Sequence, residues 1–177
     1  MTAPPAAAGA LPWPKWTYIP GDPGADPDHV TLAAAKALVP PAFRGYVPAR
    51  HPALRYGLAL NDLGYFWEAQ EILETVWAAA PQGGRERILL RACIQIATAN
   101  LRLRAQREHS ALRLFGEALA ELRKLTMRSA SGGGDGFVDS FPTHALTTVL
   151  QARLAQASLT EADWVRLGVI SRDQENV

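Results

Sequence analysis

Prolines are concentrated at the start of the chain, and they limit where helices can form. Of the 13 prolines in the 177 residues, all but Pro81 and Pro142 lie at or before Pro52. Because proline lacks a backbone donor and disfavours helix at the residue before it, this first part is predicted to be extended and looped. The run TLAAAKAL, residues 31–38, predicts one short helix that ends at the two prolines following it.

The same early segment carries more large apolar side chains than an unstructured linker would. They are Trp13, Trp16, Tyr18, Ile19, Phe43 and Tyr46. We therefore expect residues 1–11 to be disordered and residues 12–50 to form an ordered, extended arm that wraps the rest of the chain.

From Pro52 onward the apolar residues recur with helical spacing, and no alternating strand pattern of useful length is present. The spacing predicts helices over 52–62, 65–80, 86–105, 110–126 and 143–157, and a last short helix from Thr160 to Gly168. Ser110 is the predicted N-cap of the fourth helix, and Gly64 is expected to end the first. The chain is predicted to be all-α, with a helical bundle domain over residues 51–170 and a tail over 171–177.

The first four long helices pair into two hairpins, 52–80 and 86–125. Their spacing is about 44 residues rather than the 34 of a tetratricopeptide repeat, and the flanking signature of that repeat is absent, which argues against such an array. The run SASGGGDG, residues 129–136, predicts a flexible loop after the second hairpin.

The composition indicates a single domain with a substantial core, since 48% of the residues are hydrophobic. No apolar run approaches the roughly 18 residues of a membrane-spanning helix, so no membrane partner is expected. The start has no basic segment of the kind that opens a secretory signal, and the single Cys93 can form neither an internal disulfide nor a Cys-rich zinc site. We therefore expect a cytoplasmic protein in which Cys93 is an inert core thiol.

Charge is unevenly distributed along the chain, although the net charge is only +1. Residues 85–128 carry ten basic and four acidic side chains, whereas both flanking parts are acidic. This pattern indicates helices of complementary charge that hold one another.

The predicted helix 65–80 carries three glutamates at i, i+3 and i+6: Glu68, Glu71 and Glu74. Gln70 falls inside its apolar stripe and must find hydrogen-bond partners there. Such a set of carboxylates can bind a metal, act as an acid–base pair, or form a solvated acidic edge.

The predicted helix 86–105 is apolar around nearly its whole circumference, which places it at the centre of the domain. Its main polar stripe, Arg91, Gln95, Thr98 and Arg102, should meet an acidic partner because buried charge is costly unless paired. We expect a semi-buried cluster of Gln70, Glu71, Glu74, Arg91 and Gln95 between the hairpins. Such a cluster can be structural, or it can line a pocket.

Three segments in order resemble the domain-of-unknown-function 309 family (DUF309): LNDLGYFWEAQEILETVW (60–77), LLRACIQIATANLRLR (89–104) and ALRLFGEALAEL (111–122). The family's helix reads close to YFEAHEVLEELW, and its LIQLA-like stretch is matched by 93–97, including Gln95. The resemblance implies two orthogonally packed α-hairpins and no established activity. The arm, WTYIPGDPGADPDH, is similar to the proline-rich leader of proteobacterial members.

One departure from the family pattern bears on chemistry, because Gln70 stands where the family has histidine. Glutamine keeps the hydrogen bonds of histidine but is a poor metal ligand and does not transfer protons. No metal and no cofactor are therefore expected, and a structural or binding role is favoured.

The function predicted from these observations is that of a binding or interaction module for a small molecule or a protein. The expected ligand-binding residues are Glu68, Gln70, Glu71, Glu74, Arg91 and Gln95. The alternative is a hydrolase-type enzyme with Glu71 or Glu74 as general base and Arg91 holding an anionic group. A third hypothesis, RNA binding through Arg102, Arg104 and Arg107, is less favoured because a solvated basic helix end explains them, and no nucleic-acid partner is expected. Exposed apolar faces on a small bundle favour a homodimer.

Overall fold

The computed structural model describes residues 11–127 and 134–168. Every regular element in these ranges is helical, which confirms the all-α prediction. The elements are α1 (His29–Ala37), α2 (Pro52–Asp62), α3 (Phe66–Ala79), α4 (Arg85–Arg104), α5 (Glu108–Met127), α6 (Phe137–Ser140), α7 (Thr143–Ala155) and the 3₁₀ turn η1 (Glu161–Asp163). Residues 1–10 of the predicted disordered start, the tail at 171–177 and residues 129–133 of the predicted loop lie outside the described residues. Leu11 was also predicted to be disordered, and this is wrong, because it packs against the core cluster that includes Leu60 and Ile72.

The ends of α2 follow from local chemistry. Pro52 occupies the first turn, where its missing N–H costs nothing, and the imidazole Nδ1 of His51 accepts the N–H of Ala53 at 3.2 Å. Gly64, with φ of 91°, adopts the left-handed conformation that lets the chain turn into α3. Both the start at Pro52 and the stop at Gly64 were predicted, and both are confirmed.

The connection between α4 and α5 differs from the prediction. Gln106 has φ of 58°, Arg107 N–H donates to Arg102 O at 2.8 Å, and Gln106 N–H donates to Leu103 O at 3.0 Å. This pair of bonds closes a Schellman turn, so only three residues join the two helices. α5 therefore begins at Glu108, and the prediction of Ser110 as its N-cap is wrong.

The end of the described chain also differs from the prediction. Thr160 does cap a helical turn, and it forms a capping box with Asp163. The helix nevertheless stops after Asp163, so the prediction of a helix reaching Gly168 is wrong. Residues 164–168 are not helical, because their backbone groups bond to buried side chains of α2 and α4 instead.

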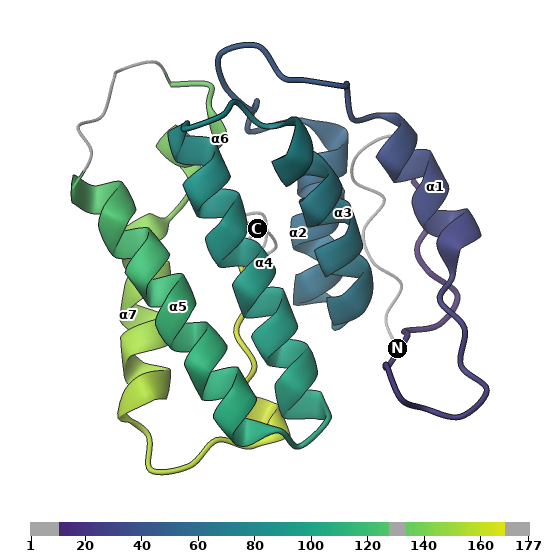
Figure 1. Cartoon of the computed structure of the whole chain (residues 1–177), viewed down its shortest axis with the longest axis vertical. Helices are drawn as coiled ribbons and strands as arrows, with labels where there is room; N and C mark the ends of the chain where they lie inside the picture. Colours follow the sequence, from purple (N-terminus) through teal and green to yellow (C-terminus); the bar gives the residue numbers. More distant parts are fainter. Residues whose placement is uncertain (1–10, 128–133, 169–177) are drawn as a thin grey trace, which may run out of the picture.

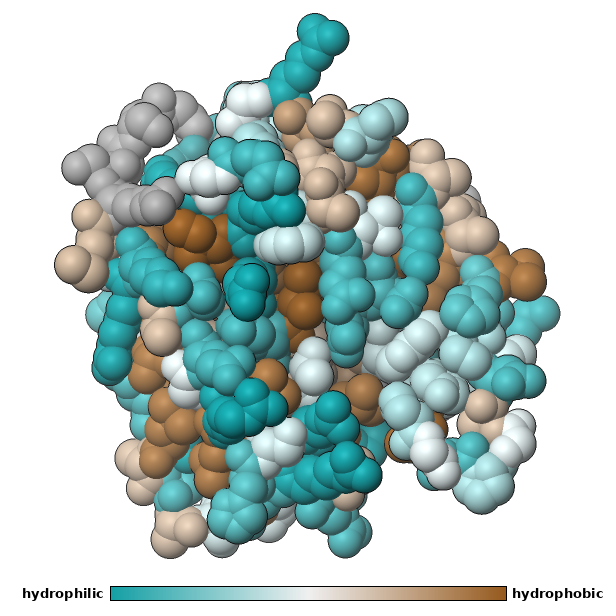
Figure 2. Space-filling view, in the orientation of Figure 1, coloured by the Kyte–Doolittle hydropathy of each residue, from teal (hydrophilic) through white to brown (hydrophobic). Residues whose placement is uncertain are grey.

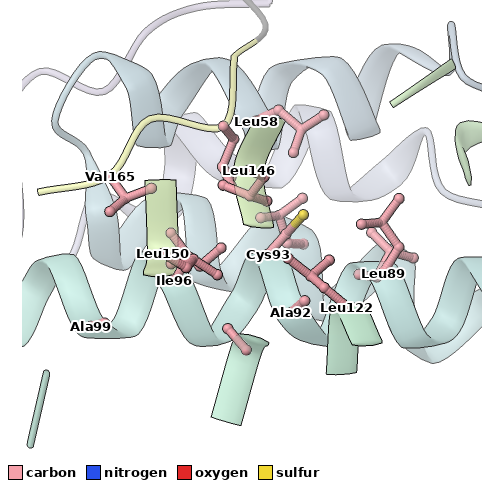
Figure 3. Close-up of a cluster of buried hydrophobic side chains, with 14 of the residues drawn as sticks. Leu58, Leu89, Ala92, Cys93, Ile96, Ala99, Leu122, Leu146, Leu150 and Val165 are labelled. Atoms are coloured by element: carbon pink, nitrogen blue, oxygen red, sulfur yellow. The ribbon is translucent and has the colours of Figure 1, made fainter. Parts of the chain in front are cut away.

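α4 is the central helix, lying between α3 and α5 as Figure 1 shows. Its buried side chains include Leu89, Cys93 and Ile96, which belong to the same hydrophobic cluster as Leu146 and Leu150 of α7 (Figure 3). Burial raises the pKa of the Cys93 thiol well above its ordinary value, consistent with an inert core residue.

Residues 11–37, which include α1, lie beside α3 on the side away from α4 (Figure 1). The ring of Trp13 packs on Tyr56 with centroids 5.4 Å apart, and Tyr18 meets Trp67 edge-on at 5.0 Å. Farther along, Phe43 N–H donates to Ala79 O at 2.8 Å. These contacts describe an ordered arm that is held by aromatic packing and hydrogen bonds.

Hydrophilic side chains separate the apolar ones into small groups on the face shown in Figure 2. None of the helices in the described ranges combines the length and the apolar character needed to cross a membrane.

Candidate functional site

The side chains predicted to form one cluster contact different neighbours. Glu71 Oε2 lies 2.8 Å from Lys36 Nζ on α1. Arg91 Nε lies 3.9 Å from Glu121 Oε1, and Gln95 Nε2 donates to Glu117 Oε2 at 3.4 Å. The polar stripe of α4 therefore meets α5 at these two positions, where two glutamates four residues apart present their carboxylates.

A smaller polar contact does join α3 to α4. The Thr98 hydroxyl donates to Gln70 Oε1 at 3.1 Å, and Gln70 Nε2 donates to Glu74 Oε1 at 3.1 Å. Gln70 and Glu74 thus come together as predicted for that pair, but their partner on α4 is Thr98. Within the part of the chain that the structure describes, no three His, Cys, Asp or Glu side chains are arranged to hold a metal ion.

Glu68 has the most unusual environment of the predicted residues, because it is fully buried. Its Oε1 accepts the backbone N–H of Tyr18 at 2.7 Å, whereas Oε2 has no hydrogen-bond partner among the described residues. Burial raises the pKa of the Glu68 carboxyl, and the Tyr18 hydrogen bond and the charge of Arg104 oppose that shift. Glu68 lies one helical turn before the buried Ile72, at the edge of the buried side of α3, and the arm covers it there.

The three arginines of the RNA hypothesis do not form one exposed surface. Arg107 is exposed, whereas Arg104 Nη1 donates to Gly64 O at 2.7 Å and its guanidinium lies 4.2 Å from the centre of the Phe66 ring. Arg104 therefore braces the turn between α2 and α3.

A buried network that was not predicted lies between α2, α4 and the last described residues. The side-chain amide of Asn100 makes both main-chain bonds to Val165: its Nδ2 donates to Val165 O at 2.8 Å, and its Oδ1 accepts Val165 N–H at 2.8 Å. Asn61 supports this pair, since it accepts from Asn100 Nδ2 at 2.9 Å and donates to Val165 O at 3.1 Å. Asn61 and Asn100 are both fully buried.

Asp62 extends the network toward the end of the described chain. Its Oδ1 accepts Leu167 N–H at 2.6 Å and Asn61 Nδ2 at 3.1 Å, and its Oδ2 accepts Gly168 N–H at 3.1 Å. Hydrogen bonds to a charged acceptor contribute about 1.5–3 kcal/mol each. We call Asn61, Asp62 and Asn100 the clamp.

The segment held by the clamp alternates between buried and exposed side chains. Val165 and Leu167 are 1% and 2% exposed, while Arg166 points outward and covers the Trp164 ring at 5.0 Å. Trp164 in turn packs on Phe66 at 5.3 Å. The clamp binds main-chain groups of this segment, while the side chains of Val165 and Leu167 and the ring of Trp164 pack against the domain.

The arm is also held through its backbone groups. Tyr56 Oη donates to Pro12 O at 2.7 Å, and Asp28 Oδ2 accepts Lys15 N–H at 3.1 Å. In these contacts and in the bond from Tyr18 N–H to Glu68, a side chain binds a backbone group of the arm.

The sequence signal for this network is Asn100, a polar residue in the nearly all-apolar helix α4. An amide in an otherwise apolar helix has to be partnered. The helical pattern alone does not reveal that its partner is a backbone 65 residues later.

Comparison with known proteins finds one family model that matches part of the chain. The model described as "Domain of unknown function (DUF309)" matches residues 54–114, which confirms the resemblance drawn from the sequence. No curated protein and no solved structure matches the chain. The matched range contains the whole clamp and Glu68, whereas the arm and the clamped segment lie outside it.

Proposed function

Residues 54–114 form a DUF309 domain, and from this premise we propose that the domain is a non-catalytic binding module for extended polypeptide segments. In this chain its own flanking segments occupy the binding surfaces.

The observation that carries the proposal is the pair of bonds between the Asn100 amide and the main chain of Val165. A side chain that binds both the N–H and the C=O of one residue recognises backbone and accepts many side chains there. Asp62 adds two more backbone N–H groups farther along. The clamp therefore fits an extended segment with an aromatic residue, two apolar residues at alternate positions, and a following glycine, as in Trp164 to Gly168.

The position of the family match supports the same function. The arm and the segment 164–168, which are both bound through backbone groups, lie outside residues 54–114. The clamp residues that bind the segment 164–168 lie inside this range. An attached segment has an effective concentration of the order of millimolar, so it outcompetes a free peptide of equal affinity. The same exchange between two copies would produce the homodimer that the sequence favours.

The hydrolase alternative has weaker support. A general base and an anion-binding arginine must face one substrate, and the groups proposed for these roles have other partners. Glu71 is paired with Lys36, and Arg91 with Glu121 on α5. The polar contacts made by the predicted residues are those of helix packing, and they support a binding module over a catalytic one.

The test opens the clamp in the full-length chain. Val165→Asp with Leu167→Asp removes the burial of the chain's own segment, and a labelled peptide of residues 159–168, LTEADWVRLG, is then titrated by fluorescence anisotropy. We expect saturable binding at least tenfold tighter than to the unmodified chain, in which the attached segment competes. The peptide carrying the same two aspartates is the control, and adding Asn100→Leu to the opened chain should abolish binding.

A second form of the experiment keeps the fold intact if the double variant is unstable. A protease site is inserted between Ala157 and Ser158, which are exposed, and the chain is cut there. The labelled peptide should then exchange into the clamp. Failure of a folded, opened or cut chain to take up the peptide would overturn the proposed function.

A further inference from the structure

A pocket of about 370 Å³ lies where the start of α2, the short helix α6 and the clamped segment meet. Its lining includes Arg50, Arg55, Phe141 and Leu167. The volume lies within the range of small-molecule sites in proteins. None of the predicted site residues lines it.

Backbone pairing between distant segments builds one side of the pocket. Pro48 and Gly136 form an isolated antiparallel bridge, with Phe137 N–H donating to Val47 O at 2.9 Å and Ala49 N–H donating to Asp135 O at 3.0 Å. This bridge fixes the turn that carries Arg50 beside α6. The opposite side is set by Asp62, which holds the backbone of Leu167 and Gly168.

The charged side chains that line the pocket are all positive. Arg50 and Arg55 line it, and no acidic side chain does. Among the described residues, neither guanidinium lies within ion-pair distance of a carboxylate, whereas Arg85, Arg91 and Arg113 each have one. Two arginines in one concave site, without an acidic partner, are suited to an oxyanion, which a guanidinium binds in bidentate geometry.

The remaining walls are apolar. Phe137 and Phe141 pack edge-to-face with centroids 5.2 Å apart, and Leu58 and Leu167 complete the lining. Among the described residues, the Ser140 hydroxyl makes one long bond, 3.4 Å to Phe137 O, so it can turn toward a ligand. A pocket with apolar walls and a few convergent polar groups is typical of small-molecule binding.

We propose that this pocket binds a small organic anion, with its carboxylate or phosphate head on Arg50 and Arg55 and a ring-sized apolar body against Phe137 and Phe141. The proposal is independent of peptide binding by the clamp. The two sites are linked, because the backbone at Leu167 and Gly168 belongs to both. A bound anion should therefore protect the clamped segment from exchange.

The experiment titrates the full chain with four probes and follows backbone amide resonances. Phenyl phosphate and benzoate carry the two head groups on the same ring, inorganic phosphate lacks the ring, and benzylamine has the ring with the opposite charge. We expect saturable shifts near Leu167 and Gly168 with at least one of the two ring-bearing anions. That anion should bind at least tenfold more tightly than inorganic phosphate, and benzylamine should not bind; the better of the two anions identifies the head group.

Variants assign the site. Arg55→Gln and Arg50→Gln should each weaken binding of the better anion at least fivefold, while Arg123→Gln, which removes an exposed arginine on α5, should leave it unchanged. Arg50 is exposed in a turn, so its variant keeps the fold even if Arg55→Gln does not. Absence of binding by both ring-bearing anions, equal binding of benzylamine, binding no tighter than inorganic phosphate, or indifference to Arg50→Gln would each overturn the proposal.

Discussion

The Asn100 side chain binds Val165 through both backbone groups of that residue, at 2.8 Å each, across 65 residues of chain. An asparagine in this arrangement replaces one strand of a backbone pairing. It connects the central helix to a segment that has no regular secondary structure around Val165, and it satisfies polar groups that would otherwise be buried without partners.

Replacing Asn100 by leucine removes both bonds and leaves Val165 and Asn61 with unpaired buried groups. An unsatisfied buried group costs about 1–3 kcal/mol, so we expect Asn100→Leu to lower the free energy of unfolding by at least about 2 kcal/mol. Urea denaturation followed by circular dichroism measures this. Thr98→Val, two residues earlier on the same helix, is the control; it loses a half-buried bond to Gln70 and should cost less than about 1 kcal/mol. Equal losses in the two variants would contradict the importance of the clamp.

Glu68→Gln should change the pH dependence of stability. The pKa of Glu68 is raised in the fold above its ordinary value of 4.5, so the fold favours the neutral acid. The stability from the neutral form is complete below that ordinary value and is lost as pH rises through the raised pKa.

Glutamine is neutral at every pH, can accept the Tyr18 N–H, and adds a donor. The unfolding free energy of Glu68→Gln relative to the unmodified chain should therefore increase from pH 4 to pH 8, as measured by denaturation across that range. The exposed Glu74→Gln is the control for loss of one negative charge. A difference between Glu68→Gln and the unmodified chain that stays flat across the range would show that Glu68 does not titrate as described.

Two glycines inside helices should respond to alanine in opposite directions. A Cβ at Gly57 would lie 2.9 Å from Leu73 Cδ2 and 3.1 Å from Ile72 Cγ2, where α2 packs on α3. A Cβ at Gly116 on α5 would meet nothing within 4 Å. Gly116→Ala should raise stability by about 0.5–1 kcal/mol through helix propensity. Overpacking costs about 1–3 kcal/mol, so Gly57→Ala should lower stability. Thermal and urea unfolding of both variants tests the pair, and stabilisation by both would contradict the close packing of α2 on α3.

Tyr56→Phe should loosen the start of the arm without disturbing the bundle. The substitution removes the bond from Tyr56 Oη to Pro12 O but keeps the ring that packs on Trp13. A hydrogen bond of this kind contributes about 1 kcal/mol, which corresponds to a severalfold increase in opening of the arm. The rate of tryptic cleavage after the exposed Lys15 measures that opening. Tyr46→Phe, at an exposed tyrosine, should leave the rate unchanged.

Helix positions were predictable because their signals are local. Pro52 sets the start of α2 and Gly64 sets its end, because each adopts a backbone conformation that few other residues favour. The nearly all-apolar pattern of residues 86–105 predicted that α4 is the central helix. The turn at Gln106 was missed because a left-handed glutamine leaves no composition signal, and Ser110 looked like a cap although it lies within the first turn of α5.

Pairings between elements were less predictable for a geometric reason. A helical wheel says which residues share a face but not which neighbour that face meets. Arg91 had acidic candidates on both the preceding and the following helix, and it pairs with Glu121 on the latter. Glu68 was predicted as one of three glutamates on its helix, and its burial could not be predicted because it depends on the course of the arm, whose Tyr18 N–H it accepts.

The clamp also determines how much chain is needed for autonomous folding. Residues 54–114 contain Asn61, Asp62 and Asn100, but the backbone groups that these side chains bind lie at 165–168. A fragment cut to the family match would keep the bonds of Asn61 to Asn100 and Asp62, but it would lose every backbone group that the clamp binds. The minimal folding unit is thus about twice as long as the stretch that marks the family, and expression boundaries drawn at the match would divide it.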